Sequence, residues 1–550
     1  MNRKISVARA GRMIGLGLLG IALAAAGPML VSTPAAGEVA SGGAASGAVA
    51  SAQAAPAETQ PDIPVDLDTA VDGGYLPIVE VSINGSTPVK MMIDEGTSFL
   101  VTFPGSIIDP TTPIDETGIP QSIQYDGTAA SGQIALATVT VTTSTGTVST
   151  PEQAAFLDAD SCTPHCLGYK DGVQGVIGIA QSKNATKNIE PPDGLYSVLA
   201  QLGPDYSSGY TIDFTSASPH IRLGRPAPGS GGDTTIQRED QDGLHYPNGQ
   251  RIFKPPVICW TISLGANVGT SCKNTVLDTG QSTGKINGDM FDSVVTPTTP
   301  PATSKAIATV SADAVISFAT HAGGPPFARL PSTGHVPHQY DQFPVERSAT
   351  ADYFNAGNDF YLSHVIGFDN ENGAVVIHAA TGAASPPSAV TATAGDRTIA
   401  VAWTPPSASG DDRPTGFVVT LRTVGGDLVS TTVVGAVEAD AQLTGLTNGT
   451  PYLVAVASVN DLTIGADATA SGPVTPGSAA SPDHSATQLA ESGSSAPTAA
   501  VLLAAALLLT GVVVLMLARR RSRHSQAADR AVAGGPGDGV APGHGASRYR

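Results

Sequence analysis

The chain has 550 residues, with 28 Lys and Arg against 47 Asp and Glu, for a formal net charge of −19. This acidity argues against nucleic acid as a partner. The length exceeds what one hydrophobic core serves, so several domains are expected. Gly, Pro, Ser, Thr, Ala and Val dominate, and no long amphipathic helical pattern occurs, which predicts an all-β protein.

The N-terminus has the pattern of an export signal. Basic residues precede an uncharged apolar run over residues 13–26, and small residues follow through Ala36. This predicts a secretory signal peptide over residues 1–36, since the apolar run is too short to favour a membrane anchor. Residues 37–70 begin with Ala, Gly, Ser and Pro and are predicted to be a flexible linker.

Two stretches place an aspartate at the end of an apolar run, directly before a turn that contains glycine. The first is VKMMIDEGTSFLV around Asp94, and the second is NTVLDTGQSTGKI around Asp278. Each follows two strand-like segments around a Gly-containing turn, with Asn84–Gly85 in the first copy. The spacing, 278 − 94 = 184 positions, suits equivalent places in two similar lobes.

These turns resemble those of the pepsin-like aspartic peptidases, in which each lobe contributes one D-T/S-G-T/S turn. The resemblance covers residues 71–380 and implies a bilobal β-barrel domain with lobes at 71–225 and 245–380. Four more segments match the family in its order: IQYDGTAASGQIALATVTV from Ile123 as the flap hairpin, GVIGIA from Gly175 beneath the first aspartate turn, YTIDFTSASPHIRLG from Tyr210, and GNDFYLSHVIGFDNENGAVVIH from Gly357.

The resemblance implies that Asp94 and Asp278 are a catalytic dyad that activates water to cleave a peptide or protein substrate. Two carboxylates in one site share one proton, because like charges that close cannot both ionise. No cofactor, metal or covalent intermediate is implied. The supporting residues are Gly96, Thr97, Thr279 and Gly280, with Tyr125 as the flap tyrosine and Gly127 in the flap turn.

Three positions depart from the family. Glu95 replaces a small hydroxyl residue that bonds across the lobe interface, and Gln281 replaces a Ser or Thr that hydrogen-bonds the neighbouring aspartate. Asn355 stands where the family has an apolar residue. Small displacements of catalytic groups lower the reaction rate strongly, and a protein can keep a fold after it has lost the activity. The alternative is therefore a catalytically inactive pepsin-like scaffold that serves as an extracellular binding or adhesion protein.

Four cysteines in an exported chain favour disulfides. Adjacent pairing, Cys162 with Cys166 and Cys259 with Cys272, is the simplest of the three connectivities. A metal site is not expected, because there is no CxxC motif and only His165 lies close by in sequence.

Residues 384–476 resemble a fibronectin type III domain. Trp403 lies on an alternating strand in VTATAGDRTIAVAWTPP, and Tyr452 follows Leu446 by six residues in LTGLTNGTPYLVAVASVN. The resemblance implies that they are the core tryptophan and the tyrosine corner of a β-sandwich. Both are packing residues in this interpretation, and the domain is a spacer or a weak binding module.

The C-terminal part predicts a surface anchor. Residues 477–498 form a second linker and contain LAESG, which resembles LAxTG-type sortase signals. Residues 499–518 are 20 positions without a charge, enough for a transmembrane helix, and the basic start of residues 519–550 predicts a cytoplasmic tail. Single-pass membrane anchoring and cell-wall anchoring by a sortase both remain open. Either places the main body outside the cell.

Overall fold

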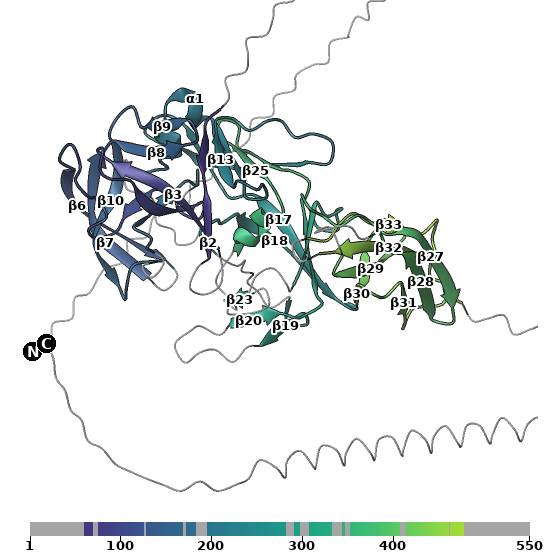
Figure 1. Ribbon diagram of the computed structural model, residues 1–550. Helices are drawn as coiled ribbons and strands as arrows, with labels where there is room; N and C mark the ends of the chain where they lie inside the picture. The colour runs from purple at the N-terminus through teal and green to yellow at the C-terminus, as the bar shows by residue number, and fades with distance from the viewer. Residues whose placement is uncertain are drawn as a thin grey trace, which may run out of the picture. The chain divides into compact units, whose positions relative to one another are not determined.

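The computed structural model describes residues 60–69, 75–125, 128–168, 172–182, 195–281, 286, 291–297, 307–332, 344–346, 353–407, 414–460 and 463–477 (Figure 1). The expected all-β fold is confirmed. The helices in this part are short: α1 (Pro204–Ser207), η2 (Leu199–Gln201) and η4 (Asn358–Leu362). The predicted signal peptide, the membrane segment and the tail lie outside the described residues. Within them, no helix has the length and apolarity needed to cross a membrane.

The predicted linker at 37–70 is wrong over residues 62–69. Two strands form there, β1 (Asp62–Pro64) and β2 (Asp66–Thr69), and β2 pairs with β3. Ile63 and Val65 are buried and alternate with the more exposed Asp62, Pro64 and Asp66, which is the period of a half-buried strand. Strand structure therefore begins earlier than the composition of the segment indicates.

We call residues 71–225 the first lobe. Most of residues 66–178 form a ten-stranded sheet. The strand order of this sheet is β6-β7-β10-β5-β11-β4-β3-β8-β9, with β2 beside β3. The remaining strands are β3 (Tyr75–Ile83), β4 (Val89–Asp94), β5 (Leu100–Thr102), β6 (Asp115–Tyr125), β7 (Thr128–Ala137), β8 (Val139–Thr143), β9 (Gly146–Ser149), β10 (Ala154–Thr163) and β11 (Gly175–Gly178).

The strand that carries Asp94 lies in the middle of this sheet. All of β4 except Lys90 is buried, as its continuous apolar run predicts for a strand covered on both faces. β11 runs parallel to β4 and sets Gly178 opposite Asp94. A Cβ on Gly178 would lie 2.4 Å from the Phe99 carbonyl oxygen, so only glycine lets the chain pass beneath the aspartate turn.

Residues 245–380, the second lobe, contain a five-stranded sheet in the order β22-β21-β17-β18-β24 and a three-stranded sheet in the order β19-β20-β23. β24 runs parallel to β18 and pairs Asn355 with Val276, two residues before Asp278. The strands are β17 (Val257–Leu264), β18 (Asn267–Val276), β19 (Val295–Pro297), β20 (Ile307–Val310), β21 (Val315–Ala319), β22 (Ala328–Pro331), β23 (Pro344–Glu346) and β24 (Tyr353–Asn355).

Strands from both lobes share a six-stranded antiparallel sheet in the order β1-β13-β12-β25-β26-β14. The lobes join where β12 pairs with β25, and there the rings of Tyr210 and Phe368 lie 5.0 Å apart. This sheet fixes the lobes to each other. Besides β1, its strands are β12 (Gly209–Asp213), β13 (His220–Leu223), β14 (Thr234–Gln237), β25 (Ile366–Asp369) and β26 (Ala374–Ile377). A hairpin of β15 (Asp240–His245) and β16 (Arg251–Phe253) follows β14.

The C-terminal described residues form two packed sheets, drawn in green to yellow in Figure 1. Trp403 packs on Phe417 of the facing sheet, with 5.4 Å between the ring centres. The Thr447 N–H donates a hydrogen bond to the Tyr452 hydroxyl at 3.3 Å. Both residues have the packing roles expected of them. One sheet contains β27 (Ser388–Gly395), β28 (Thr398–Thr404) and β31 (Asp440–Leu443), and the other contains β29 (Gly416–Thr423), β30 (Leu428–Gly435), β32 (Tyr452–Val459) and β33 (Ala468–Thr469).

The predicted disulfide pairing is confirmed. Cys162, near the end of β10, bonds Cys166 in the segment that follows, and Cys259 bonds Cys272 directly across the hairpin of β17 and β18. Each bridge therefore holds a local turn or hairpin.

The close passage at Gly178 generates a stability prediction. Gly178→Ala is expected to lower the free energy of unfolding by about 2 kcal/mol or more, because the added methyl meets a fixed backbone oxygen. Gly203→Ala is the matched control, since its Cβ would meet nothing within 4 Å, and its change should stay within about 1 kcal/mol. Urea unfolding of the full chain measures both. Equal stability of the two variants would contradict the packing described here.

Candidate active site

The structure brings Asp94 and Asp278 together, and the glycines of both turns make this possible. A Cβ on Gly96 would lie 2.7 Å from the Asp278 carboxyl carbon, and a Cβ on Gly280 would lie 2.6 Å from that of Asp94. Each turn therefore leaves room for the carboxyl of the other lobe. Both aspartates are buried, with 5% and 8% of their surface exposed.

The two carboxyls receive matching sets of hydrogen bonds. On each, Oδ1 accepts from the glycine two residues on, Gly96 N at 2.7 Å and Gly280 N at 2.9 Å. Each Oδ2 accepts from a side chain. The Thr97 hydroxyl donates to Asp94, and the Asn355 amide donates to Asp278 at 2.6 Å.

Asn355 is the site residue whose role sequence reasoning missed. Its Nδ2 also donates to Gln281 Oε1 at 2.8 Å, and its Oδ1 accepts from Gly357 N at 2.8 Å. Gln281 therefore does not donate to Asp278 but holds the residue that does. The two departures from the family motif are parts of one network, and the only sequence signal for it is that both occur in the same chain.

A hydroxyl links the two aspartate turns across the lobes. Thr279 donates to the Ile93 carbonyl at 3.0 Å and accepts from Glu95 N at 3.0 Å. Glu95 enters this contact through its backbone only. The first lobe therefore lacks the matching side-chain hydroxyl, as the sequence predicts, while the second lobe keeps its own.

The Glu95 side chain stays inside the protein, with 7% of the residue exposed. Burial is the largest effect on its carboxyl and raises the pKa well above the usual value. The positive charge of Arg238 acts in the opposite direction, and the charges of Asp278 and Asp94 raise the pKa further. Glu95 is thus a third buried carboxyl whose proton depends on the dyad.

Arg238 is buried directly after β14 and is held by a loop of the second lobe. Its guanidinium donates to the carbonyls of Gly373 at 3.2 Å and Asp369 at 3.4 Å, and its carbon lies 4.9 Å from the centre of the Phe253 ring. Burial lowers the pKa of this guanidinium, although the surrounding phenols and acids partly oppose the effect. The sequence gives no sign of this buried cation, which is far from Glu95 along the chain.

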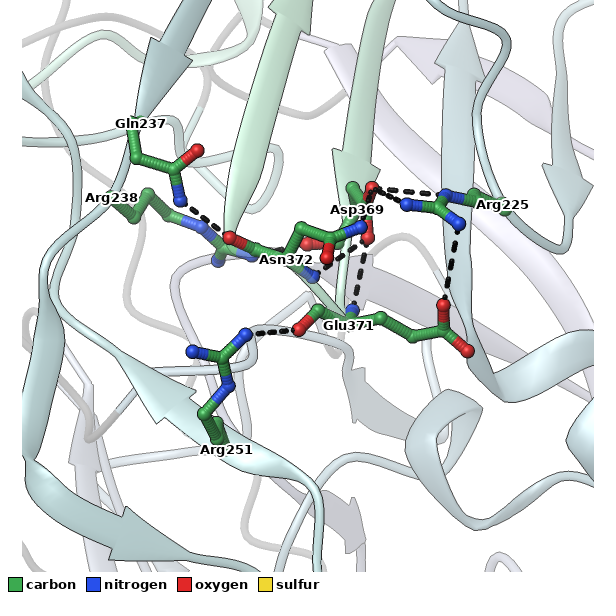
Figure 2. Close-up of polar contacts among 7 residues, drawn as sticks. All are labelled: Arg225, Gln237, Arg238, Arg251, Asp369, Glu371 and Asn372. Carbon is green, nitrogen blue, oxygen red and sulfur yellow. Dashed lines mark hydrogen bonds and ion pairs between the residues drawn. The ribbon is translucent and has the colours of Figure 1, made fainter. Parts of the chain in front are cut away.

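Figure 2 shows how the loop that holds Arg238 is fixed. The Asp369 carboxyl accepts from the Arg225 guanidinium at 3.0 Å and from the Asn372 amide at 2.8 Å. Its other oxygen accepts the backbone N–H groups of Glu371 and Asn372, at 3.0 and 2.9 Å. Burial is the largest effect on the Asp369 carboxyl and raises its pKa, but hydrogen bonds from Asn372 and Arg225 and the Arg225 charge together outweigh it and hold the pKa below its usual value. The loop therefore keeps a carboxylate that orders the acceptors of Arg238.

Burial has the largest effect on the pKa of Asp94 and raises it well above the usual value, and the Asp278 charge raises it further. Hydrogen bonds from Thr97 and Gly96 lower it in part. Asp94 therefore keeps its proton to a higher pH than an ordinary aspartate does.

Tyr125, the predicted flap tyrosine, ends β6 and lies close to the first aspartate. Burial raises the pKa of its phenol well above the usual value, the Asp94 charge raises it further, and a hydrogen bond with Thr97 opposes both. The predicted flap glycine, Gly127, lies outside the described residues.

Two other features of the described residues bear on site chemistry. No group of three His, Cys, Asp or Glu side chains is arranged there to hold a metal ion. A cavity of about 460 Å³ lies away from both aspartates and is lined mainly by apolar side chains such as Val315, Val418 and Ile464. It brings no acid–base or nucleophilic pair together. The aspartate pair is therefore the stronger candidate site.

The buried Glu95 generates a pH prediction. Its folded pKa is raised, so the native chain keeps a proton that the unfolded chain releases above about pH 4.3, and stability falls as pH rises through that window. Glu95→Gln removes this loss, worth about 1.4 kcal/mol for each unit of pKa difference. The melting temperature of the variant is therefore expected to gain on wild type steadily between pH 4 and pH 7.

Thermal unfolding of the full chain across that range measures the effect. Asp440→Asn is the control, because this aspartate is exposed on β31 of the sandwich, away from Glu95 and Arg238. A Glu95→Gln advantage that shrinks with pH would mean that Glu95 is ionised beside Arg238 in the native state.

Comparison with known families concerns the C-terminal sandwich. Residues 385–474 match the sequence profile of the Fibronectin type III domain. No curated protein matches the chain. The sandwich of β27 to β33 is thus a Fibronectin type III domain, a kind of β-sandwich shared by many cell-surface proteins.

Proposed function

We propose that the chain is a pepsin-like aspartic endopeptidase that hydrolyses peptide bonds with Asp94 and Asp278. The observation that carries the proposal is the facing pair of buried carboxyls, each with one backbone and one side-chain donor. Glycines at both turns, Gly96 and Gly280, admit the opposite carboxyl, so the pairing is built into both motifs.

The chemistry follows from one proton shared by two carboxyls. The ionised carboxyl takes a proton from a bound water, whose oxygen bonds to the amide carbon, while the protonated carboxyl gives its proton to the carbonyl oxygen. The tetrahedral intermediate then collapses. The C–N bond breaks, the nitrogen takes the proton that came from water, and the other carboxyl regains its own. Water and amide become acid and amine, and the pair is restored.

The polar residues around the pair support this function. Thr97, Gly96 and Gly280 donate hydrogen bonds that keep the carboxyls in place before the substrate arrives. Tyr125 lies near Asp94 and Thr97, where it would cover the substrate and exclude water. The substrate class is peptide or protein.

The setting that we propose is the outside of the cell. The signal-like N-terminus, the disulfides and the Fibronectin type III domain agree with export. The C-terminal apolar segment would tether the chain to the membrane, or LAESG would pass it to a sortase for cell-wall attachment. The Fibronectin type III domain then acts as a spacer or a weak binding module.

Cleavage of an unfolded protein substrate by the full chain, from pH 3 to pH 7, tests the proposal. Asp94→Asn and Asp278→Asn are each expected to lower the rate by at least about 100-fold, because each removes a general acid or base. Asp440→Asn is the control, since this exposed aspartate lies on β31 of the sandwich, and its rate should equal that of wild type.

Pepstatin binding by calorimetry is the second readout. Its hydroxyl-bearing carbon stands in for the tetrahedral carbon of the intermediate, so it is expected to bind wild type and not Asp278→Asn. Absence of both cleavage and pepstatin binding would instead favour the inactive scaffold that binds or adheres outside the cell.

A further inference from the structure

One sheet of the Fibronectin type III domain is buried on its outer face as well as on its inner face. On β29, Phe417 and Val419 point into the core of the sandwich and are fully buried. Val418 lies between them and belongs to the opposite face, yet only 1% of it is exposed. Ala457, its partner on β32, and Val459 are buried on the same outer face. A sandwich strand that faces water alternates apolar with polar residues, so this outer face is covered.

The second lobe provides the cover. Val315 of β21 packs in one apolar cluster with Val418, Val459 and Ile464, and only 2% of Val315 is exposed. Its neighbour Ile316 belongs instead to the core of the lobes. Because successive side chains of a strand point to opposite faces, β21 supplies one face to the lobe core and the other to the sandwich.

Backbone hydrogen bonds join the sandwich to two separate parts of the second lobe. β22 is the edge strand of its sheet, and there the Arg329 carbonyl accepts from the Ile464 N–H at 3.0 Å and from the Thr463 hydroxyl at 3.1 Å. At the turn between β17 and β18, the Gly265 carbonyl accepts from the Thr431 N–H at 3.0 Å. An edge strand that would otherwise present unpaired carbonyls is thus partly closed by the sandwich.

Polar side chains fix how the two surfaces meet. The Thr431 hydroxyl donates to the Ser263 hydroxyl of β17 at 3.0 Å, and both residues are buried. The Arg329 guanidinium donates to the Asp467 carboxylate at 2.7 Å and to the Gly465 carbonyl, and only 11% of the Arg329 side chain is exposed. Charge-assisted hydrogen bonds that are shielded from water set the register of two surfaces more firmly than exposed ion pairs do.

The residues that connect the second lobe to the sandwich are held against the sandwich. The Gly382 carbonyl accepts from the Asn460 amide at 2.6 Å, and the Ser385 carbonyl accepts from the Ser458 hydroxyl at 2.7 Å. Ala384, between them, is buried with 2% of its surface exposed. A linker between independent domains is exposed and makes few contacts, and this connection is the opposite.

We propose that the Fibronectin type III domain and the second lobe unfold as one cooperative unit, in which the domain braces the strands that carry Asp278. The sandwich contacts the turn from which β18 runs toward Asp278, and it covers β21 and β22 of the same sheet. The domain is therefore part of the structure of the second lobe, in addition to any role as a spacer. This goes beyond the proposed peptidase function and does not depend on it.

Hydrogen–deuterium exchange of the full chain, read by mass spectrometry, tests the proposal. Val418→Asp places an unpaired carboxylate in the apolar cluster and is expected to speed amide exchange in β17, β18, β21 and β22 by about tenfold or more. Leu453→Asp is the matched control, because Leu453 lies on the outer face of β32 but is 37% exposed, and it should leave these rates unchanged. Second-lobe rates that are equal in the two variants would overturn the proposal, even if Val418→Asp unfolds the sandwich.

A second variant approaches the contact from the lobe and decides the question if Val418→Asp cannot be purified. Arg329→Met keeps the apolar stem but removes the ion pair with Asp467, and is expected to speed exchange around Thr431 in β30 by about threefold, the effect of one ion pair. Arg222→Met, which breaks the more exposed ion pair with Asp62, is the control and should leave β30 unchanged.

The extent of the change in Arg329→Met separates the outcomes. Faster exchange in β30, which contacts the lobe at another place, supports one cooperative unit. A change confined to residues 463–467 would mean that the sandwich unfolds independently of the lobe, and would overturn the proposal. Exchange involves no cleavage, so a chain without peptidase activity can still confirm the coupling, and an active chain can still lack it.

Discussion

Two carboxyl groups that face each other out of water cannot both carry a charge, and the centre of this protein is arranged around that constraint. Glycines bring the turns together, because any Cβ would occupy the place of the opposite carboxyl. Backbone and side-chain donors then give the charged carboxyl the hydrogen bonds that water would otherwise have given it. The sheet shared by both lobes joins the two turns at a distance, so the pairing of the carboxyls depends on packing well away from them.

Local patterns in the sequence predict the aspartate turns, because a buried strand, an aspartate and a glycine follow one another in the chain. The disulfides and the packing of Trp403 and Tyr452 were also predictable from short spacings and alternation. The donor to Asp278 was not, because Asn355 lies 77 positions away and replaces a group that the local motif lacks. Asn355 and Gln281 each suggest a damaged site when taken alone. Together they supply a donor to Asp278 and hold it in place, and only the three-dimensional contact between them shows this.

Glu95 illustrates a different kind of replacement. A hydroxyl at this position would complete a symmetric link between the lobes, but the glutamate adds an acid to a site that already contains two. The positive charge of Arg238, which lies between the two lobes in sequence, partly opposes the rise in the Glu95 pKa. The loop that contains Asp369 keeps the arginine in place. The fold thus keeps the link from Thr279 on one side, and on the other side it has a buried carboxyl in place of a hydroxyl. The protonation of Glu95 therefore depends on Arg238, which lies outside the two turns, as well as on the two aspartates.

The contact between Glu95 and Thr279 joins parts of the chain that are 184 positions apart. Neither half contains a usable fragment of the site, because each carboxyl needs the other to hold the shared proton. A chain that is still being made, or whose second half is misfolded, has one ordinary aspartate and no paired one. If the protein is a peptidase, it cannot cleave other proteins or itself before its own folding is complete. Assembly of the two lobes would then control when activity begins.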